Sequence, residues 1–131
     1  MSWGGNLKPF DIILQGGSGS QSTNGGISAS VALPYNMVKK VELWSLFDHN
    51  FDGMITLTIK GFTGDYNGNI TTTINNLPIL ATKTAKRSDI SESNPLVLDL
   101  TNVNKYKYLY IRLSGTGWNY EQIGMIKVYP R

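Results

Sequence analysis

The amino-acid sequence predicts an all-β fold: an antiparallel β-sandwich, eight-stranded and jelly-roll-like, with an extended N-terminal arm. Three observations lead to this fold class. Short segments alternate apolar and polar residues, as strands with one buried face do. Turn-forming pairs such as Asp52-Gly53 and Asn67-Gly68 separate these segments. Glycine, serine, threonine and asparagine are abundant whereas glutamate and alanine are scarce, a balance that disfavours helices. A set of eight strands suits a jelly roll in particular.

The segment Met54–Gly61 shows the alternation most clearly, because aliphatic residues alternate there with Thr56, Thr58 and Lys60. In Val38–Phe47, alternation places Trp44 and Leu46 on the face opposite Leu43. The other predicted strands are Phe10–Leu14, Ile27–Leu33, Asn69–Ile74, Leu96–Leu100, Tyr108–Leu113 and Ile123–Tyr129. The segment Ala81–Ser91 is predicted to form either a short helix or a loop.

The length of 131 residues fits one domain with its own hydrophobic core. We divide it into an extended arm, residues 1–26, with one short strand and a Gly/Ser-rich segment, and a β-sandwich domain, residues 27–131.

The charge and the cysteine content exclude several kinds of function. The formal net charge is +3, and the few cations do not gather into the basic stripe of a nucleic-acid reader, so nucleic acid is an unlikely partner. The chain has no cysteine and therefore neither disulfides nor thiolate chemistry. No signal peptide or membrane-spanning apolar run is recognisable, so we expect synthesis in a cytoplasm and no membrane partner.

A row of tyrosines is the strongest functional signal. Alternation along Tyr108–Leu113 and the residues before it assigns Leu109, Ile111 and Leu113 to the core. The opposite face then carries Tyr106, Tyr108, Tyr110 and Arg112, residue types enriched at protein interfaces. We expect this row to contact a partner, together with Trp3 of the arm, although cross-strand packing on an outer face explains it too.

A second aromatic group follows a glycine-rich loop. Trp118, Asn119 and Tyr120 offer flat apolar rings and a polar amide, which suit a sugar ring. The alternative is that Trp118 folds back and caps the end of the sandwich.

One segment matches the first half of a calcium loop. Asp48, Asn50 and Asp52 supply oxygen ligands at alternate positions, with Gly53 next. The twelfth position, which should be a bidentate carboxylate, is Ile59, so the segment is either a partial Ca²⁺ site or a tight hairpin turn. Otherwise no cofactor is expected. No catalytic residues are predicted, because His49 is the single histidine and no phosphate-binding or paired-carboxylate signature is present.

Two resemblances complete the prediction. Tyr108–Leu113 followed by Ile123–Tyr129 resembles the last two strands of galactose-binding-like jelly rolls, to which many carbohydrate-binding modules belong. The composition and the arm resemble small structural proteins of tailed bacteriophages. We therefore expect a non-enzymatic virion structural protein, a head decoration or a tail or baseplate component, that contacts other virion proteins and copies of itself. The alternative is a carbohydrate-binding module or adhesin that stacks cell-surface glycan on loop aromatics.

Overall fold

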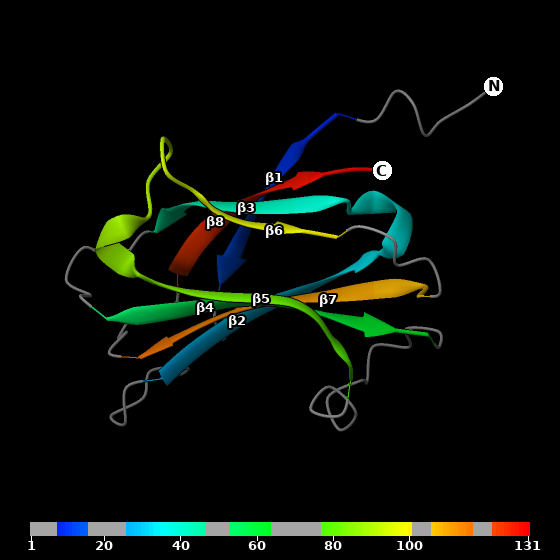
Figure 1. Ribbon diagram of the computed structural model, residues 1–131, viewed down its shortest axis with the longest axis horizontal. Coiled ribbons are helices and arrows are strands. Elements are labelled where there is room, and N and C mark those ends of the chain that lie inside the picture. Colours follow the sequence, from blue (N-terminus) through cyan, green and yellow to red (C-terminus); the bar gives the residue numbers. More distant parts are fainter. Residues whose placement is uncertain (1–7, 16–25, 47–52, 64–76, 101–105, 117–121) are drawn as a thin grey trace.

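The computed structural model describes residues 8–15, 26–46, 53–63, 77–100, 106–116 and 122–131. In these ranges the chain forms two four-stranded antiparallel sheets that pack face to face (Figure 1). Sheet A has the strand order β1-β8-β3-β6, and sheet B has the order β2-β7-β4-β5. The strands are β1 (Phe10–Gln15), β2 (Gly26–Pro34), β3 (Lys40–Leu46), β4 (Met54–Phe62), β5 (Ile79–Lys86), β6 (Leu96–Asp99), β7 (Tyr108–Thr116) and β8 (Gln122–Tyr129).

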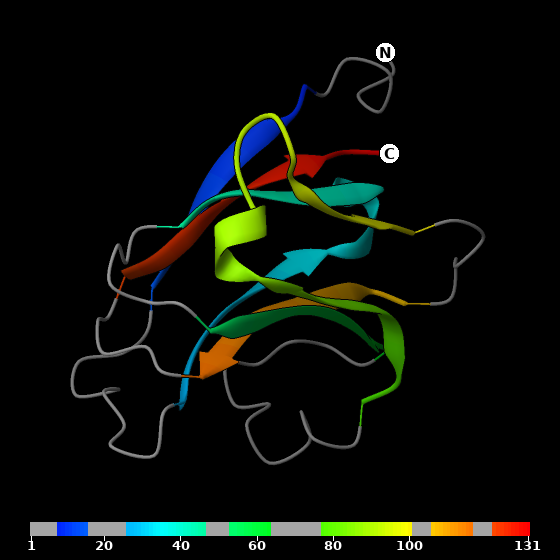
Figure 2. The same ribbon diagram turned by 60° about the vertical axis from the view of Figure 1, so that its left-hand side comes forward.

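The strand order confirms the predicted jelly roll. Strand β1 pairs with β8, β2 with β7, β3 with β6 and β4 with β5, and every pair is antiparallel. This nested pairing describes one long hairpin that rolls up into two sheets. Successive strands therefore alternate mostly between the sheets, and Figure 2 shows the two layers from a second direction.

The core lies between the two inner faces and is aliphatic. Because side chains alternate along a strand, every second residue points into the core, and Ile55, Leu57 and Ile59 of β4 are buried there. On β7 the buried residues are Leu109, Ile111 and Leu113, as the sequence predicts. Sheet A contributes Leu14, Val41, Leu43, Leu98, Ile126 and Val128. Burial of each such side chain stabilises the fold by roughly 1.5–3 kcal/mol relative to its exposure.

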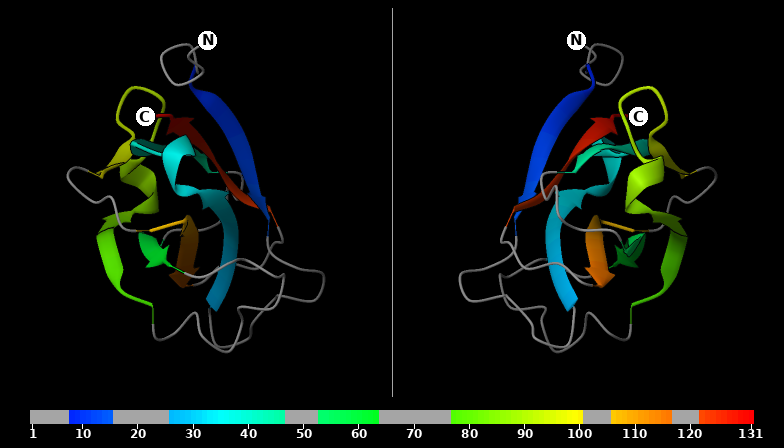
Figure 3. Two further views of the ribbon diagram at one scale, coloured as in Figure 1. Left: turned by 90° about the vertical axis from the view of Figure 1, so that its right-hand side faces the viewer. Right: turned by 90° about the vertical axis from the view of Figure 1, so that its left-hand side faces the viewer.

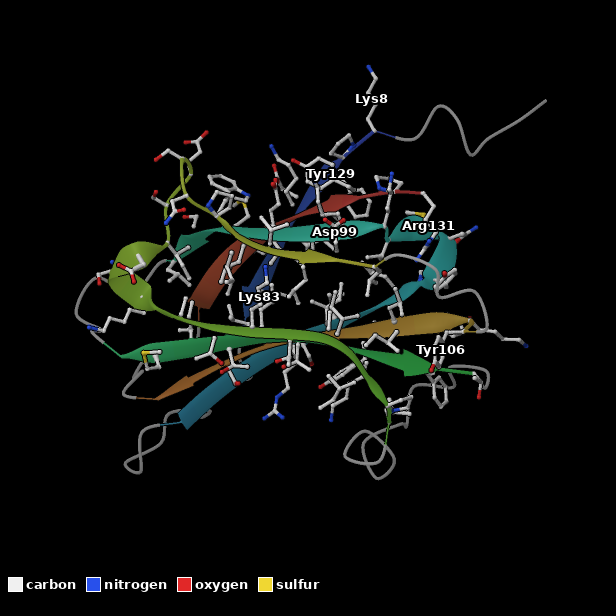
Figure 4. The ribbon with its side chains drawn as sticks, viewed as in Figure 1. Lys8, Lys83, Asp99, Tyr106, Tyr129 and Arg131 are labelled. Atoms are coloured by element: carbon white, nitrogen blue, oxygen red, sulfur yellow. The ribbon has the colours of Figure 1, made fainter. Side chains whose placement is uncertain are left out.

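The two open sides of the sandwich differ. On one side β1 lies beside β2, and on the other β5 approaches β6, as the end views of Figure 3 show. Lys83 of β5 lies opposite Leu57 in the β4–β5 register, so it points toward the space between the sheets and yet is exposed (Figure 4). A charge that points inward on an edge strand hinders pairing with a further strand.

The prediction of a helix or loop for Ala81–Ser91 is wrong over most of its length. Residues 81–86 belong to β5, and only Arg87–Asp89 form a turn of 3₁₀ helix. Pairing with β4 decides the conformation, because Thr82 and Thr84 bond through their hydroxyls to threonines of β4, at 3.0 and 2.9 Å. The predicted strand Asn69–Ile74 lies outside the described residues. The short strand of the predicted arm is β1, which is an integral strand of sheet A. None of the described residues form a helix that could span a membrane.

Candidate functional site

A hollow of about 270 Å³ lies on the outer face of sheet A. Its lining combines one large aromatic ring with charged side chains and comes from four separate segments of the chain. We call it the Trp44 hollow, and its residues are Asp11, Glu42, Trp44, Glu92, Pro95 and Lys127.

Trp44 lies at a β-bulge. In the pairing of β3 with β8, Leu43 lies opposite Ile126 and Ser45 lies opposite Met125, so Trp44 is an extra residue with no partner on β8. A bulge bends the strand and redirects the side chain of the extra residue. Trp44 keeps the outward position that alternation from Leu43 gives it, whereas Leu46 beyond the bulge points inward and packs against the core.

The indole of Trp44 reaches across the sheet. Its Nε1–H donates a hydrogen bond of 3.2 Å to Oδ1 of Asp11. Asp11 belongs to β1 and Trp44 to β3, with β8 between them, so the side chains bridge two strand spacings of about 4.8 Å each. The ring is half-buried and held at its polar end, which gives the hollow an aromatic floor of fixed orientation.

A tyrosine holds the second carboxylate of the hollow. The hydroxyl of Tyr129 donates to Oε1 of Glu42 at 2.5 Å, and the ammonium of Lys40 lies 4.2 Å from the centre of the Tyr129 ring. The hydrogen bond to Glu42, followed by desolvation and the charges of Glu42 and Asp11, raises the pKa of Tyr129 above its ordinary value. Figure 4 shows Tyr129 on the outer side of sheet A.

Lys127 lies between the two carboxylates and is bonded to neither. In the register it is opposite Asp11 on β1 and opposite Glu42 on β3. Such cross-strand neighbours usually form ion pairs. Here Trp44 and Tyr129 bond to the carboxylates instead, and the part of the chain that the structure describes offers Lys127 no ion pair or hydrogen bond. Among these residues the ammonium is therefore available to a ligand.

The segment before β6 forms a wall of the hollow and rises above sheet A in Figure 1. It carries Glu92 and Pro95. Internal hydrogen bonds tie it down: Asn94 Nδ2 donates to the carbonyl oxygen of Asp89 at 2.7 Å, and Ser91 pairs with Asn94 through the backbone. The wall is thus a folded element of the site.

The lining of the hollow can hold a ligand by stacking and by hydrogen bonding. A held indole offers an apolar face, carboxylates accept hydrogen bonds and an ammonium donates them. Within the described ranges no three acidic or histidine side chains converge as metal ligands.

The predicted tyrosine row lies on the other sheet. Tyr108, Tyr110 and Arg112 alternate with the buried residues of β7 and lie on the outer face of sheet B, all half-buried. Their neighbours on β2 are the small residues Pro34, Ala32 and Ser30. Whether a partner covers the row stays a prediction.

Tyr106 occupies a different position from the rest of the row. It precedes β7, and its ring packs directly over Gly61, where a Cβ atom would lie 2.5 Å from Cδ1 of the ring. Tyr106 also lines a shallow hollow of about 450 Å³ at the end of the sandwich, with Pro34, Tyr35, Asn36, Lys107 and Tyr108. Arg131 stacks on the Tyr35 ring there, 4.0 Å from its centre.

The remaining candidate residues lie outside the described part of the chain. They are Trp3 of the arm, Trp118, Asn119 and Tyr120 of the loop, and Asp48, Asn50 and Asp52 of the calcium-like segment. Sequence reasoning missed the Trp44 hollow. The available signal was the alternation of Glu42 and Trp44 on an outward face, but no spacing in the sequence links them to Asp11, Glu92 or Lys127.

Comparison with known proteins gives distant structural likenesses only. No protein-family model matches the chain, and no curated protein matches it in sequence. Among solved structures, it is similar to a carbohydrate-binding module, TmCBM27, that recognises mannan, with 10% identity over 95% of this chain and 89% of that one, at a TM-score of 0.49. It is also similar to TmCBM61, solved with β-1,4-galactotriose, with 13% identity over 92% of this chain and 77% of that one, at 0.38. The protein PirA matches with 8% identity over 96% of this chain and 95% of its own, at 0.41. At these scores the likenesses assign no ligand.

Proposed function

We propose that this chain is a non-enzymatic carbohydrate-binding domain whose binding site is the Trp44 hollow. One observation carries the proposal: the indole of Trp44 is held across the outer face of sheet A by Asp11, beside carboxylates and an ammonium that keep hydrogen-bonding capacity among the described residues. Sugars present an apolar ring face bordered by hydroxyl groups, and an aromatic ring beside hydrogen-bonding side chains complements both.

The binding mechanism follows from the geometry. A sugar ring packs on the exposed side of the Trp44 indole, while its hydroxyls donate to carboxylates and accept from Lys127. Because the hydrogen bonds to Asp11 and Glu42 already fix the polar groups, little side-chain entropy is lost on binding. The hollow is slightly smaller than the roughly 300–1,000 Å³ of sites for drug-sized ligands. It suits a short stretch of a glycan.

The tailed-phage virion role stays a prediction, and it is compatible with glycan binding. A protein displayed in many copies on a lattice turns a weak contact per copy into durable attachment. No residue of the Trp44 hollow is specific to that setting.

A glycan array probed with the full chain tests the proposal, followed by calorimetry on the best binder. Trp44→Ala is expected to weaken binding at least tenfold, which corresponds to about 1.4 kcal/mol. Trp44→Phe keeps an aromatic ring but loses the hydrogen bond to Asp11. Its affinity is expected to lie between that of the wild type and that of Trp44→Ala. Phe62→Ala on the outer face of sheet B is the matched control and should leave affinity unchanged. A blank array, or full affinity in Trp44→Ala, refutes the proposal. Lys127→Ala replaces Trp44→Ala if the latter fails to fold.

A further inference from the structure

We infer that the Trp44 hollow selects neutral sugars that present two adjacent free hydroxyl groups, and that Tyr129 is the residue that positions Glu42 for them. This inference rests on the proposed function and goes beyond it, because it names the ligand class and a residue that acts without touching the ligand.

The carboxylate oxygens divide into occupied and available ones. Oδ1 of Asp11 accepts from Trp44, and Oε1 of Glu42 accepts from Tyr129. Among the described residues the second oxygen of each group has no hydrogen-bond donor. A carboxylate accepts several hydrogen bonds, so each available oxygen has the capacity for a ligand hydroxyl.

The cation between them completes the pattern. Lys127 lies on β8, between β1 with Asp11 and β3 with Glu42. An ammonium has three donors and no acceptor. Two adjacent hydroxyls can therefore each donate to one carboxylate and accept from Lys127, which gives Asp11, Glu42 and Lys127 each a ligand partner. A single hydroxyl leaves one carboxylate without its hydrogen bond, at a cost in affinity.

The charge of the hollow disfavours acidic sugars. Three carboxylates, those of Asp11, Glu42 and Glu92, face one ammonium in the lining. A uronic or sialic acid brings a further negative charge to this surface, where the half-buried carboxylate of Glu42 and the exposed carboxylates of Asp11 and Glu92 repel it. Neutral hydroxyls meet no such penalty.

Tyr129 prevents a competing ion pair. Without its hydroxyl, Glu42 is free to turn toward Lys127, its neighbour in the register, and both groups are then lost to the ligand. Tyr129→Phe keeps the ring under Lys40 and removes only the hydrogen bond.

The experiment is calorimetry on the full chain with three probes derived from the best neutral binder on the array. These are the neutral oligosaccharide, the same oligosaccharide with a uronic acid at its end, and its O-methylated form. We expect the acid and the methylated form to bind at least tenfold more weakly. Equal or tighter binding of the acid overturns the inference while the proposed function stands, whereas failure of all three probes refutes both.

A double-mutant cycle tests the role of Tyr129. Tyr129→Phe is expected to weaken binding of the neutral probe about fivefold, and to have no further effect in a Glu42→Ala background. If the two substitutions weaken binding additively, Tyr129 does not act through Glu42 and its positioning role is wrong. Tyr35→Phe is the matched control, because Tyr35 stacks with Arg131 outside the lining of the Trp44 hollow.

Discussion

Gly124 offers a sharp test of how the Trp44 bulge is built. It lies on β8 opposite Leu14 of β1 and Leu46 of β3, at the point where the β3–β8 register shifts. A Cβ atom at this position would lie 2.6 Å from the carbonyl oxygen of Ser45 and 3.1 Å from Cδ2 of Leu46. Glycine in a strand often marks such a close approach of another backbone.

The magnitude of Gly124→Ala follows from what the methyl group meets. The nearest atom belongs to the backbone of the bulge and has no rotamer by which to move away. Overpacking of this kind costs about 1–3 kcal/mol, and a backbone clash in a buried position belongs at the upper end. Unfolding entropy of about 2.1 cal/mol/K per residue gives roughly 0.28 kcal/mol/K for 131 residues. A loss of about 3 kcal/mol therefore lowers Tm by about 11 °C.

Urea unfolding and a thermal melt measure this loss, with Ser30→Ala on the exposed face of sheet B as the control. The free energy of unfolding of the control should stay within about 0.5 kcal/mol of that of the wild type. Because Ser45 follows Trp44, the displaced carbonyl also shifts the indole, so glycan affinity should fall with stability. Gly124→Ala with wild-type stability would mean that the bulge does not approach β8 as described.

Three further predictions concern other parts of the fold. Gly61→Ala should destabilise the chain by about 1–2 kcal/mol because its methyl group meets the Tyr106 ring, and most of that cost should vanish in a Tyr106→Ala background; an unchanged cost there would contradict the contact. Because the pKa of Tyr129 is higher in the folded than in the unfolded chain, the unfolded chain loses the hydroxyl proton at a lower pH. The stability that the protonated Tyr129 contributes is therefore fully present below pH 10.0 and is lost as the pH rises through the folded-state pKa. Urea titrations at alkaline pH should show a shallower decline for Tyr129→Phe than for wild type, and equal slopes would contradict the hydrogen bond to Glu42. Lys83→Val should promote self-association through the edge strand β5, and a monomer by light scattering at high concentration would count against that role.

The sequence was sufficient for the strands in which burial and alternation agree. In β4 and β7 large aliphatic residues occupy every second position from Ile55 to Ile59 and from Leu109 to Leu113, so the alternation alone identifies the two inner faces. Strand β5 lacks that signal. Its inward positions hold Ala81, Lys83 and Ala85, because an edge strand covers little of the core, and its pairing with β4 is a tertiary contact that local pattern does not encode.

The candidate site was hidden for a related reason. Regular alternation along Val38–Phe47 correctly predicts that Trp44 points outward. It also predicts that Leu46 lies on the same face, which is wrong, because Leu46 points toward the core. One extra residue at the bulge reverses the alternation from Ser45 onward. Its cause lies on another strand, since only glycine at position 124 lets the carbonyl of Ser45 approach so closely. The bulge beside the aromatic floor thus depends on a glycine about eighty positions away in the chain, and a site of this kind becomes visible only when the strands are paired.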